Sequence, residues 1–202
     1  MTLILATNNV HKRDELLTVL KRELGDAIQI QTLAEAGLNG LEIEETGTTL
    51  EENALIKART VFELTSRPTV SDDTGLEVGA LNGAPGVYSA RYAGAAASYS
   101  DNVEKLLRAM DGVADRSARF RTVIAFIDST GAEHTFSGEV EGMITTAPRG
   151  SAGFGYDPVF APTIEGNGAK TFAEMTPDVK NQISHRANAL RAFADYLKTL
   201  PR

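Results

Sequence analysis

The stretch TVSDDTGLEV, residues 69–78, runs from β-branched residues into two adjacent aspartates and then a glycine. Adjacent like charges repel, and each carboxylate disfavours ionisation of the other when both are buried. Asp-Thr-Gly is favourable turn chemistry, so one interpretation is a polar corner between a strand and a loop. The other interpretation is that a divalent cation offsets the repulsion between Asp72 and Asp73. Taken alone, the stretch favours the turn, because Asp pairs that form turns are common.

The composition indicates a globular protein and narrows its partners. Of the 202 residues, 42% are apolar and 23% charged, and this length allows one large domain or two lobes. The net charge of −7 argues against a nucleic-acid partner, which usually meets a basic surface. Because the chain has no cysteine, disulfides, thiolate catalysis and zinc–sulfur sites are excluded.

The hydropathy of the chain predicts no membrane segment. No run approaches the roughly 20 apolar residues that a membrane helix needs. The short apolar run at residues 3–6 is followed by the charged stretch HKRDE at 11–15, which is neither a signal peptide nor an anchor. We therefore expect a soluble cytoplasmic protein without a membrane partner.

The spacing of apolar residues predicts an α/β fold with a mixed sheet and two lobes. Each expected helix has an apolar face, and two of them have a candidate N-cap, Asn8 or Asn9 in one case and Thr48 or Thr49 in the other. The expected strands are 3–7, 27–33, a short one before Asp72, and a hairpin of 118–128 with 135–144. The expected helices span about 10–24, 50–65, 99–111 and 184–199.

The loop TNNVHK, residues 7–12, lies between the first expected strand and helix. Backbone N–H groups at a helix start favour phosphate, and Lys12 lies one turn into the helix. No Walker motif occurs in the chain. A capped helix with a solvated lysine is the alternative interpretation.

Two pairs of acidic residues, Glu44–Glu45 and Asp72–Asp73, could hold a cation, and Lys57 lies on the helix after the first pair. Magnesium usually takes one or two carboxylates and completes its shell with water and substrate phosphate. The alternative for the glutamates is that they complement a helix dipole.

The C-terminal third carries GFGYD at 153–157, Lys180, and SHR at 184–186. Phe154 between two glycines is unusual as a core residue, and an exposed ring there suits stacking on a flat ligand. His185 alone is better explained as a surface residue at a helix start. Taken together, the chain offers carboxylates for a cation, an aromatic ring for a base, and four basic residues for phosphates: Lys12, Lys57, Lys180 and Arg186.

Six ordered motifs resemble those of the inosine triphosphate pyrophosphatases, also called XTP/dITP diphosphatases. They are LATNNVHKRDEL (5–16), EETGTTLEENALIKA (44–58), SDDTGLEV (71–78), LNGAPGVYSARYAG (81–94), GFGYDPVF (153–160) and ISHRANAL (183–190). The resemblance covers residues 2 to 198. It departs at Asn8 and His11, where the family often has glycine, at Thr74 for serine and at Ser71 for alanine.

The resemblance implies a homodimeric, magnesium-dependent enzyme that hydrolyses ITP, dITP and XTP to the monophosphate and pyrophosphate. It implies an elongated α/β fold in which residues 1–202 form a single domain with two lobes. A central mixed sheet is flanked by helices, and the substrate lies in the cleft.

The resemblance also assigns roles to residues. It makes Glu45 and Asp73 metal ligands and Asp73 the general base, with Lys12 and Lys57 stabilising the leaving group. Glu44 and Asp72 are expected next to the metal ligands and not in direct contact with the metal. The implied substrate-binding residues are Thr7, Asn8, Asn9, Val10, His11, Lys12, Thr74, Phe154, Gly155, Tyr156, Asp157, Lys180, His185 and Arg186.

Two further arguments refine these roles. Successive residues of a strand point to opposite faces, so only one of the two aspartates can face the metal directly, and we expect Asp73. Arg186 and His185 can donate hydrogen bonds, and donors beside the 6-oxo group would accept hypoxanthine and xanthine over adenine. No residue identifies itself as the filter against guanine.

Two other functions fit the same residues. One is a pyrophosphatase for other modified nucleotides, such as methylated or pyrimidine triphosphates. The other is a nucleotide sensor without turnover, although a sensor needs no group to activate water.

Overall fold

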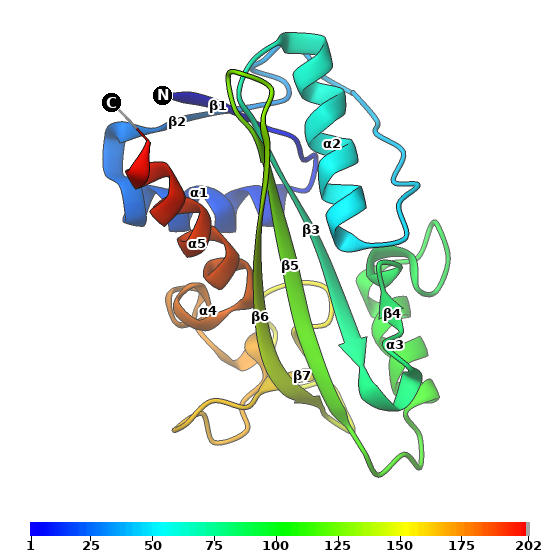
Figure 1. Ribbon diagram of the computed structural model, residues 1–202. Helices are drawn as coiled ribbons and strands as arrows, with labels where there is room; N and C mark the ends of the chain where they lie inside the picture. The colour runs from blue at the N-terminus through cyan, green and yellow to red at the C-terminus, as the bar shows by residue number, and fades with distance from the viewer. Residues whose placement is uncertain (201–202) are drawn as a thin grey trace. The chain divides into compact units, whose positions relative to one another are not determined.

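The structure, a computed structural model, describes residues 1–200 and is a mixed α/β fold (Figure 1). The strands are β1 (Thr2–Leu5), β2 (Gln29–Thr32), β3 (Thr69–Val78), β4 (Pro85–Gly86), β5 (Ser117–Ile127), β6 (Glu133–Ile144) and β7 (Phe160–Pro162). The helices are α1 (Val10–Leu24), α2 (Leu50–Thr65), α3 (Tyr99–Ala109), α4 (Pro177–Ile183) and α5 (His185–Thr199). Four single turns of 3₁₀ helix are η1 (Gly25–Ala27), η2 (Gly79–Leu81), η3 (Ser89–Arg91) and η4 (Phe172–Glu174).

Within residues 1–200, seven strands form one sheet in the order β2-β1-β3-β5-β6-β7, with β4 paired to β3. Strand β1 is parallel to β2 and to β3, whereas β3–β4 and β6–β7 are antiparallel. The predicted mixed sheet is therefore confirmed. Two parallel neighbours around β1 are what a strand–helix–strand beginning produces.

The two helices that lead into the polar residues are fixed at their N-termini. Asn9 caps α1, and its side chain accepts a hydrogen bond from the Lys12 amide. Thr49 caps α2 in a capping box with Glu52, in which each side chain accepts from the other residue's backbone N–H. Each cap is one of the alternatives that the sequence offered.

The chain divides into two compact units. Unit 1 contains Met1–Asp73, Thr122–Gly138 and the chain from Arg186 onward. Unit 2 contains Thr74–Arg121 and Glu139–His185. The division falls within strands β3, β5 and β6.

Unit 1 is built in three layers, and the alternation of β1 shows how. Leu3 and Leu5 on one face of β1 belong to the core cluster that includes Leu16 of α1 and Phe193 of α5. Ile4 on the opposite face packs with Val61 of α2 and with Leu33. Helices α1 and α5 therefore cover one face of the sheet in this unit and α2 covers the other, as Figure 1 shows.

Unit 2 has its own apolar core. Its centre is a group of phenylalanines in which the Phe120 ring lies 4.7 Å from Phe160 and 6.3 Å from Phe172. Leu106 of α3 and Leu76 of β3 complete this cluster. This core includes Val103 and Leu106 of α3 and Tyr156 of the loop around residue 154.

Strand β3 is longer than the sequence predicted. A short strand ending at a turn around Asp72 and Asp73 was expected, but β3 continues for ten residues through both of them. The turn interpretation is wrong, because backbone pairing on both sides of Asp-Thr-Gly overrides its local turn preference. Helix α4 and strand β7 were not predicted.

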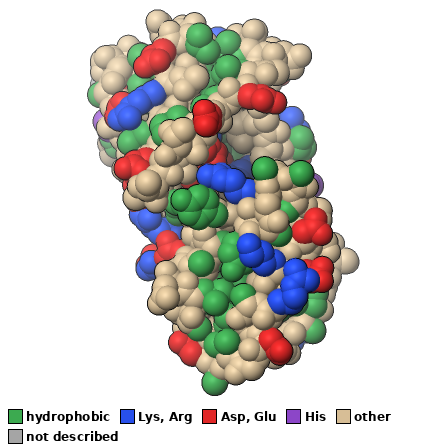
Figure 2. All heavy atoms as spheres, turned by 90° about the vertical axis from the view of Figure 1, so that its right-hand side faces the viewer, with side chains coloured by type: hydrophobic (Ala, Val, Ile, Leu, Met, Phe, Trp, Pro, Cys, Tyr) green, Lys and Arg blue, Asp and Glu red, His purple; other side chains and the backbone are tan. Residues whose placement is uncertain are grey.

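Two general features bear on partners. No helix among the described residues is long and apolar enough to cross a membrane. Figure 2 shows acidic and basic side chains interspersed over the face that it displays.

Candidate active site

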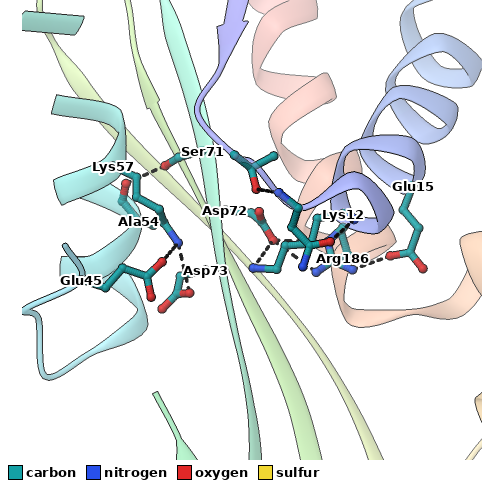
Figure 3. Close-up of polar contacts among 11 residues, drawn as sticks. Lys12, Glu15, Glu45, Ala54, Lys57, Ser71, Asp72, Asp73 and Arg186 are labelled. Carbon is teal, nitrogen blue, oxygen red and sulfur yellow. Dashed lines mark hydrogen bonds and ion pairs between the residues drawn. The ribbon is translucent and has the colours of Figure 1, made fainter. Parts of the chain in front are cut away.

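Asp72 and Asp73 lie in the middle of β3 and are both buried, with exposed fractions of 1% and 6%. Because they are consecutive in a strand, their side chains point to opposite faces of the sheet. Figure 3 shows Asp72 directed toward Lys12 and Arg186, and Asp73 directed toward Lys57 and Glu45. Each carboxylate therefore has its own set of partners.

Asp72 is held by cations on the side of α1 and α5. Its Oδ2 atom lies 3.2 Å from the Lys12 Nζ and accepts hydrogen bonds from the Arg186 Nη2 and Nε at 3.2 and 3.3 Å. The Arg186 side chain is 2% exposed, and its Nη1 also donates to Glu15. Two acids and two bases thus form a buried ion-pair cluster (Figure 3).

Burial opposes ionisation of Asp72, but the charges of Lys12, Arg186 and Lys57 outweigh it. They hold the pKa of Asp72 well below its ordinary value. Asp72 is therefore a carboxylate at neutral pH, and in this cluster it serves to orient Lys12 and Arg186.

Asp73 faces α2 on the other side of the sheet. The Lys57 Nζ donates to Asp73 Oδ1 at 3.3 Å and to Glu45 Oε1 at 2.5 Å. Glu45 is half-buried whereas Glu44 is exposed, so Glu45 is the member of that pair that meets Lys57. The second carboxylate oxygen of Asp73 is buried and accepts no hydrogen bond from any residue between 1 and 200.

Burial raises the pKa of Asp73 above its ordinary value. Lys57 and Lys12 oppose the rise, and the negative charges of Glu45 and Asp72 add to it. Burial also disfavours the charged form of Lys57, but Asp73 and Glu45 outweigh it, and the pKa of Lys57 is raised. A carboxyl with a raised pKa and an open oxygen is suited to accept a proton.

The same residues can be tested against a divalent cation. The structure brings together no group of three or more acidic or histidine ligands among the described residues. Magnesium needs only one or two protein carboxylates when water and substrate phosphate supply the rest. Asp73, with one unpartnered buried oxygen, and the neighbouring Glu45 meet that smaller requirement.

The loop before α1 is held in place by hydrogen bonds within the chain. The Asn9 amide donates to Thr7 Oγ1 at 3.2 Å, and the Asn8 side chain donates to the Leu41 carbonyl at 2.8 Å. A cavity of about 130 Å³ adjoins Thr7, Asn8 and Asn9. Asn8 and His11, where the family often has glycine, are both exposed, and Lys12 is half-buried.

In unit 2, Asp157 organises the loop around Phe154. Its Oδ2 accepts hydrogen bonds from the Phe154 amide at 2.8 Å and from the Lys180 Nζ at 2.6 Å. The Lys180 ammonium also lies 4.7 Å from the centre of the Phe154 ring. Gly153 allows this arrangement, because a Cβ atom there would lie 2.0 Å from Asp157 Oδ2.

Two of the expected substrate residues have buried side chains. His185 was expected at the surface, but it is 3% exposed and stacks on Phe120 with ring centres 4.5 Å apart. Tyr156 is buried too, and its hydroxyl donates to the Ser89 carbonyl at 2.9 Å. Burial raises the pKa of Tyr156, so its hydroxyl stays protonated. Both side chains support the site from within the core of unit 2.

Sequence reasoning missed three polar residues that the structure places around the aspartates. Glu15 pairs with Arg186, Ser71 Oγ donates to the Ala54 carbonyl at 2.6 Å, and Asn53 Oδ1 accepts from the Gly47 amide at 2.7 Å. Ser71 had a signal, because its hydroxyl stands where the family often has alanine. Glu15 and Asn53 lie within two of the motifs that carry the resemblance, but their partners, Arg186 and the Gly47 amide, could not be read from the sequence.

The predicted residues thus fall into two groups. Unit 1 brings together Thr7 to Lys12, Glu45, Lys57, Asp72, Asp73 and Arg186. Unit 2 contains Thr74, Phe154 to Asp157, Lys180 and His185. The first group has the charges for phosphate and metal, and the second has the aromatic ring for a base.

The Ham1 family model matches residues 3–196. Among curated relatives, the dITP/XTP pyrophosphatase of Porphyromonas gingivalis is 50% identical over 196 residues, which is 96% of each chain. The dITP/XTP pyrophosphatase of Thermoanaerobacter sp. is 47% identical and covers 98% of this chain and 96% of its own.

Solved structures are similar over the same length. A HAM1 protein from Coxiella burnetii has a TM-score of 0.88 and 38% identity, covering 99% of this chain and all of the other. The Staphylococcus aureus Ham1 protein has a TM-score of 0.86 and 36% identity, covering 98% of each chain.

Proposed function

The chain belongs to the Ham1 family, and on that premise we propose that it hydrolyses non-standard purine nucleoside triphosphates (ITP, dITP and XTP) to the monophosphate and pyrophosphate. One observation carries the proposal. Strand β3 presents an ionised Asp72 among cations on one face, and on the other a buried Asp73 with an open oxygen beside Lys57 and Glu45. Removal of non-standard triphosphates would cleanse the nucleotide pool.

Asp73 is proposed as the general base. Its carboxylate takes a proton from water as the water oxygen bonds to the α-phosphorus. The bond from that phosphorus to the bridging oxygen breaks, and pyrophosphate leaves with the electron pair. The raised pKa of Asp73 brings its basicity closer to that needed near neutral pH.

Magnesium is the proposed cofactor, with Glu45 and Asp73 as its protein ligands. When bound, it would neutralise phosphate charge and polarise the attacking water. The ligand types support this proposal, since magnesium prefers carboxylate oxygens and one buried Asp73 oxygen accepts no hydrogen bond within residues 1–200. Glu44, which is exposed, stands outside this pair.

Lys12 and Lys57 are proposed to stabilise the negative charge that develops on the leaving pyrophosphate. Both ammonium groups are held by carboxylates, Lys12 by Asp72 and Lys57 by Glu45 and Asp73, so they are oriented before substrate binds. The loop from Thr7 to Lys12 is proposed to bind phosphate oxygens at the start of α1. The amides of Thr7, Asn9 and Lys12 already donate within the chain, to the Leu5 carbonyl, Thr7 Oγ1 and Asn9 Oδ1.

The base is proposed to bind in unit 2, where Phe154 offers its ring for stacking and Thr74 would lie beside the substrate. Gly155, Tyr156 and Asp157 shape the loop, and Lys180 lies at the ring. His185 and Arg186 are predicted to donate hydrogen bonds to the 6-oxo group of the base. The contacts of Arg186 with Asp72 and Glu15 give it a second role, that of holding Asp72.

We also propose that the enzyme is a homodimer acting in the cytoplasm. Support comes from the family resemblance of the sequence, and the native mass of the purified protein tests the dimer. A mass near twice 21.6 kDa is expected, and a mass near 21.6 kDa at micromolar concentration would contradict it.

The test of the proposed function is a panel of ITP, dITP, XTP, dATP, dGTP and dTTP, with pyrophosphate and orthophosphate measured separately. Pyrophosphate should be released from the first three, with kcat/KM at least about tenfold above that for dATP, because one mismatched donor costs that much. Orthophosphate release would contradict the reaction type. A preference for dTTP would favour the wider house-cleaning role, and tight binding without turnover would favour a sensor.

A further inference from the structure

Tyr99 stands beside the proposed base site and belongs to none of the motifs that carry the family resemblance. It is the first residue of α3, and its side chain is 43% exposed. A capping box fixes this helix start, since the Ser98 amide donates to Asp101 at 2.8 Å and the Asp101 amide donates to Ser98 at 3.2 Å. The position of Tyr99 is therefore set by the backbone around it.

The Tyr99 ring contacts Phe154. The two ring centres are 6.0 Å apart and the planes are inclined at 45°. This is a tilted pair within the range of attractive aromatic contacts. Because the rings are not stacked on each other, neither covers the other's face.

The other surroundings of Phe154 limit how a ligand can approach it. The Lys180 ammonium lies 4.7 Å from the ring centre, and Asp157 holds both that ammonium and the Phe154 amide. A flat ligand that stacks on Phe154 would therefore lie close to both the Lys180 ammonium and the Tyr99 ring. A purine is a two-ring system and is wider than one phenyl ring, so a second aromatic ring at the edge extends its contact area.

We infer that Tyr99 is a specificity-determining residue that widens the aromatic wall of Phe154 and binds the purine base of the triphosphate substrate. This inference rests on the proposed function. Its chemical content is that Tyr99 adds affinity for a bicyclic base and contributes nothing to binding of the phosphates.

The test compares Tyr99→Ala, Tyr99→Phe and the matched control Tyr88→Ala. Tyr88 is an exposed tyrosine at 54%, and its ring lies under the Arg91 guanidinium at 5.3 Å. Loss of one tilted aromatic contact with the base should raise the KM for dITP about three- to tenfold in Tyr99→Ala, with kcat within twofold. Tyr99→Phe keeps the ring and should stay within twofold of the parent, as should Tyr88→Ala.

Two further measurements separate the base from the phosphates and the inference from the function. Inhibition by inorganic tripolyphosphate should be equal in Tyr99→Ala and the parent, and an equal loss for tripolyphosphate and dITP would overturn the inference. So would a Tyr99→Ala variant that matches Tyr88→Ala.

Calorimetric binding of dITP, with calcium in place of magnesium to slow turnover, does not depend on hydrolysis. A parent protein that binds dITP but releases no pyrophosphate would refute the proposed function alone, and the inference would then stand or fall on the affinity ratio.

Discussion

Asp72 and Asp73 are neighbours in the chain, yet their environments shift their pKa values in opposite directions. Three cations outweigh burial at Asp72 and lower its pKa, whereas at Asp73 burial and two acidic neighbours outweigh the lysines and raise it. The difference follows from strand geometry, since one residue step moves a side chain from the α1–α5 face to the α2 face. The ionised member orients cations, and the other is suited to accept a proton.

Asp73→Asn tests the role of the base. The variant loses the group that takes the proton, so kcat should fall by at least about a hundredfold while nucleotide binding stays measurable. A raised pKa means that the ionised carboxylate destabilises the fold at neutral pH, so the free energy of unfolding should not decrease. Steady-state kinetics and urea unfolding provide the two readouts. Turnover within a few-fold of the parent would show that Asp73 is not the base.

Asp72→Asn, unlike Asp73→Asn, should lower the free energy of unfolding. Replacing the anion leaves Lys12 and Arg186 without their shared buried partner, and we expect a loss of about 3–5 kcal/mol in unfolding free energy at pH 7. Nucleotide affinity should also fall, since both cations lose their orientation. An exposed control is Asp14→Asn, whose side chain is 61% exposed.

The stability difference at Asp72 should depend on pH with a definite sign. Because the folded-state pKa is lowered, the contribution is fully present above the ordinary pKa of about 3.9 and is lost as the pH falls below it. Urea unfolding at pH 7, 5 and 3 should therefore show parent and Asp72→Asn converging toward pH 3. A gap that is constant with pH would mean that charge pairing does not hold Asp72.

At the scale of elements, the site depends on how α2 is fixed to β3. Ser71 and Asp73 share one face of β3, and the Ser71 hydroxyl donates to the carbonyl of Ala54, one turn before Lys57 on α2 (Figure 3). Asn53, the preceding residue of α2, accepts the amide of Gly47 in the loop that carries Glu45. Two consecutive helix residues thus align Lys57 with both of its carboxylates.

Ser71→Ala removes the contact between β3 and α2. The lost hydrogen bond should lower the unfolding free energy by about 0.5–1.5 kcal/mol and, through misalignment of Lys57, lower kcat several-fold. Thr60→Ala is the matched control, because its hydroxyl also donates to a carbonyl, that of Ile56, but within α2. Equal kcat values for the two variants would contradict an aligning role, and Ser71→Thr should restore kcat.

The elements also show which features a sequence can predict. Apolar spacing located α1, α2 and α5, and cap chemistry placed two helix starts within one residue. The alternation of side chains along a strand is sufficient to assign Asp72 and Asp73 to opposite faces. The length of β3 was missed because its Asp-Thr-Gly favours a turn locally, and only pairing with neighbouring strands extends it.

The same limit applies within the candidate site. The resemblance and the sequence located Phe154, Asp157 and Lys180, but the contacts of Lys180 with the other two join residues more than twenty positions apart and depend on tertiary packing. The burial of His185 likewise depends on Phe120, which lies on a distant strand. Composition and spacing identify such residues and leave their partners undetermined.

At the scale of the whole molecule, activity should require a divalent cation. EDTA should abolish pyrophosphate release and magnesium should restore it, whereas calcium should restore it poorly because its larger shell tolerates looser geometry. Far-UV circular dichroism in EDTA provides a control that the chelated protein stays folded. Full activity in EDTA would contradict the metal requirement, and with it the proposed role of Glu45 and Asp73 as metal ligands.

We propose that Asp73, on one face of β3, activates water for attack on the α-phosphorus of a non-standard purine triphosphate. Hydrolysis of dITP in water enriched in oxygen-18, followed by mass spectrometry of both products, tests it directly. Attack at the α-phosphorus puts the label in dIMP and leaves pyrophosphate unlabelled, and this is the result expected. Label in the pyrophosphate would mean attack at the β-phosphorus, and would contradict the proposed reaction.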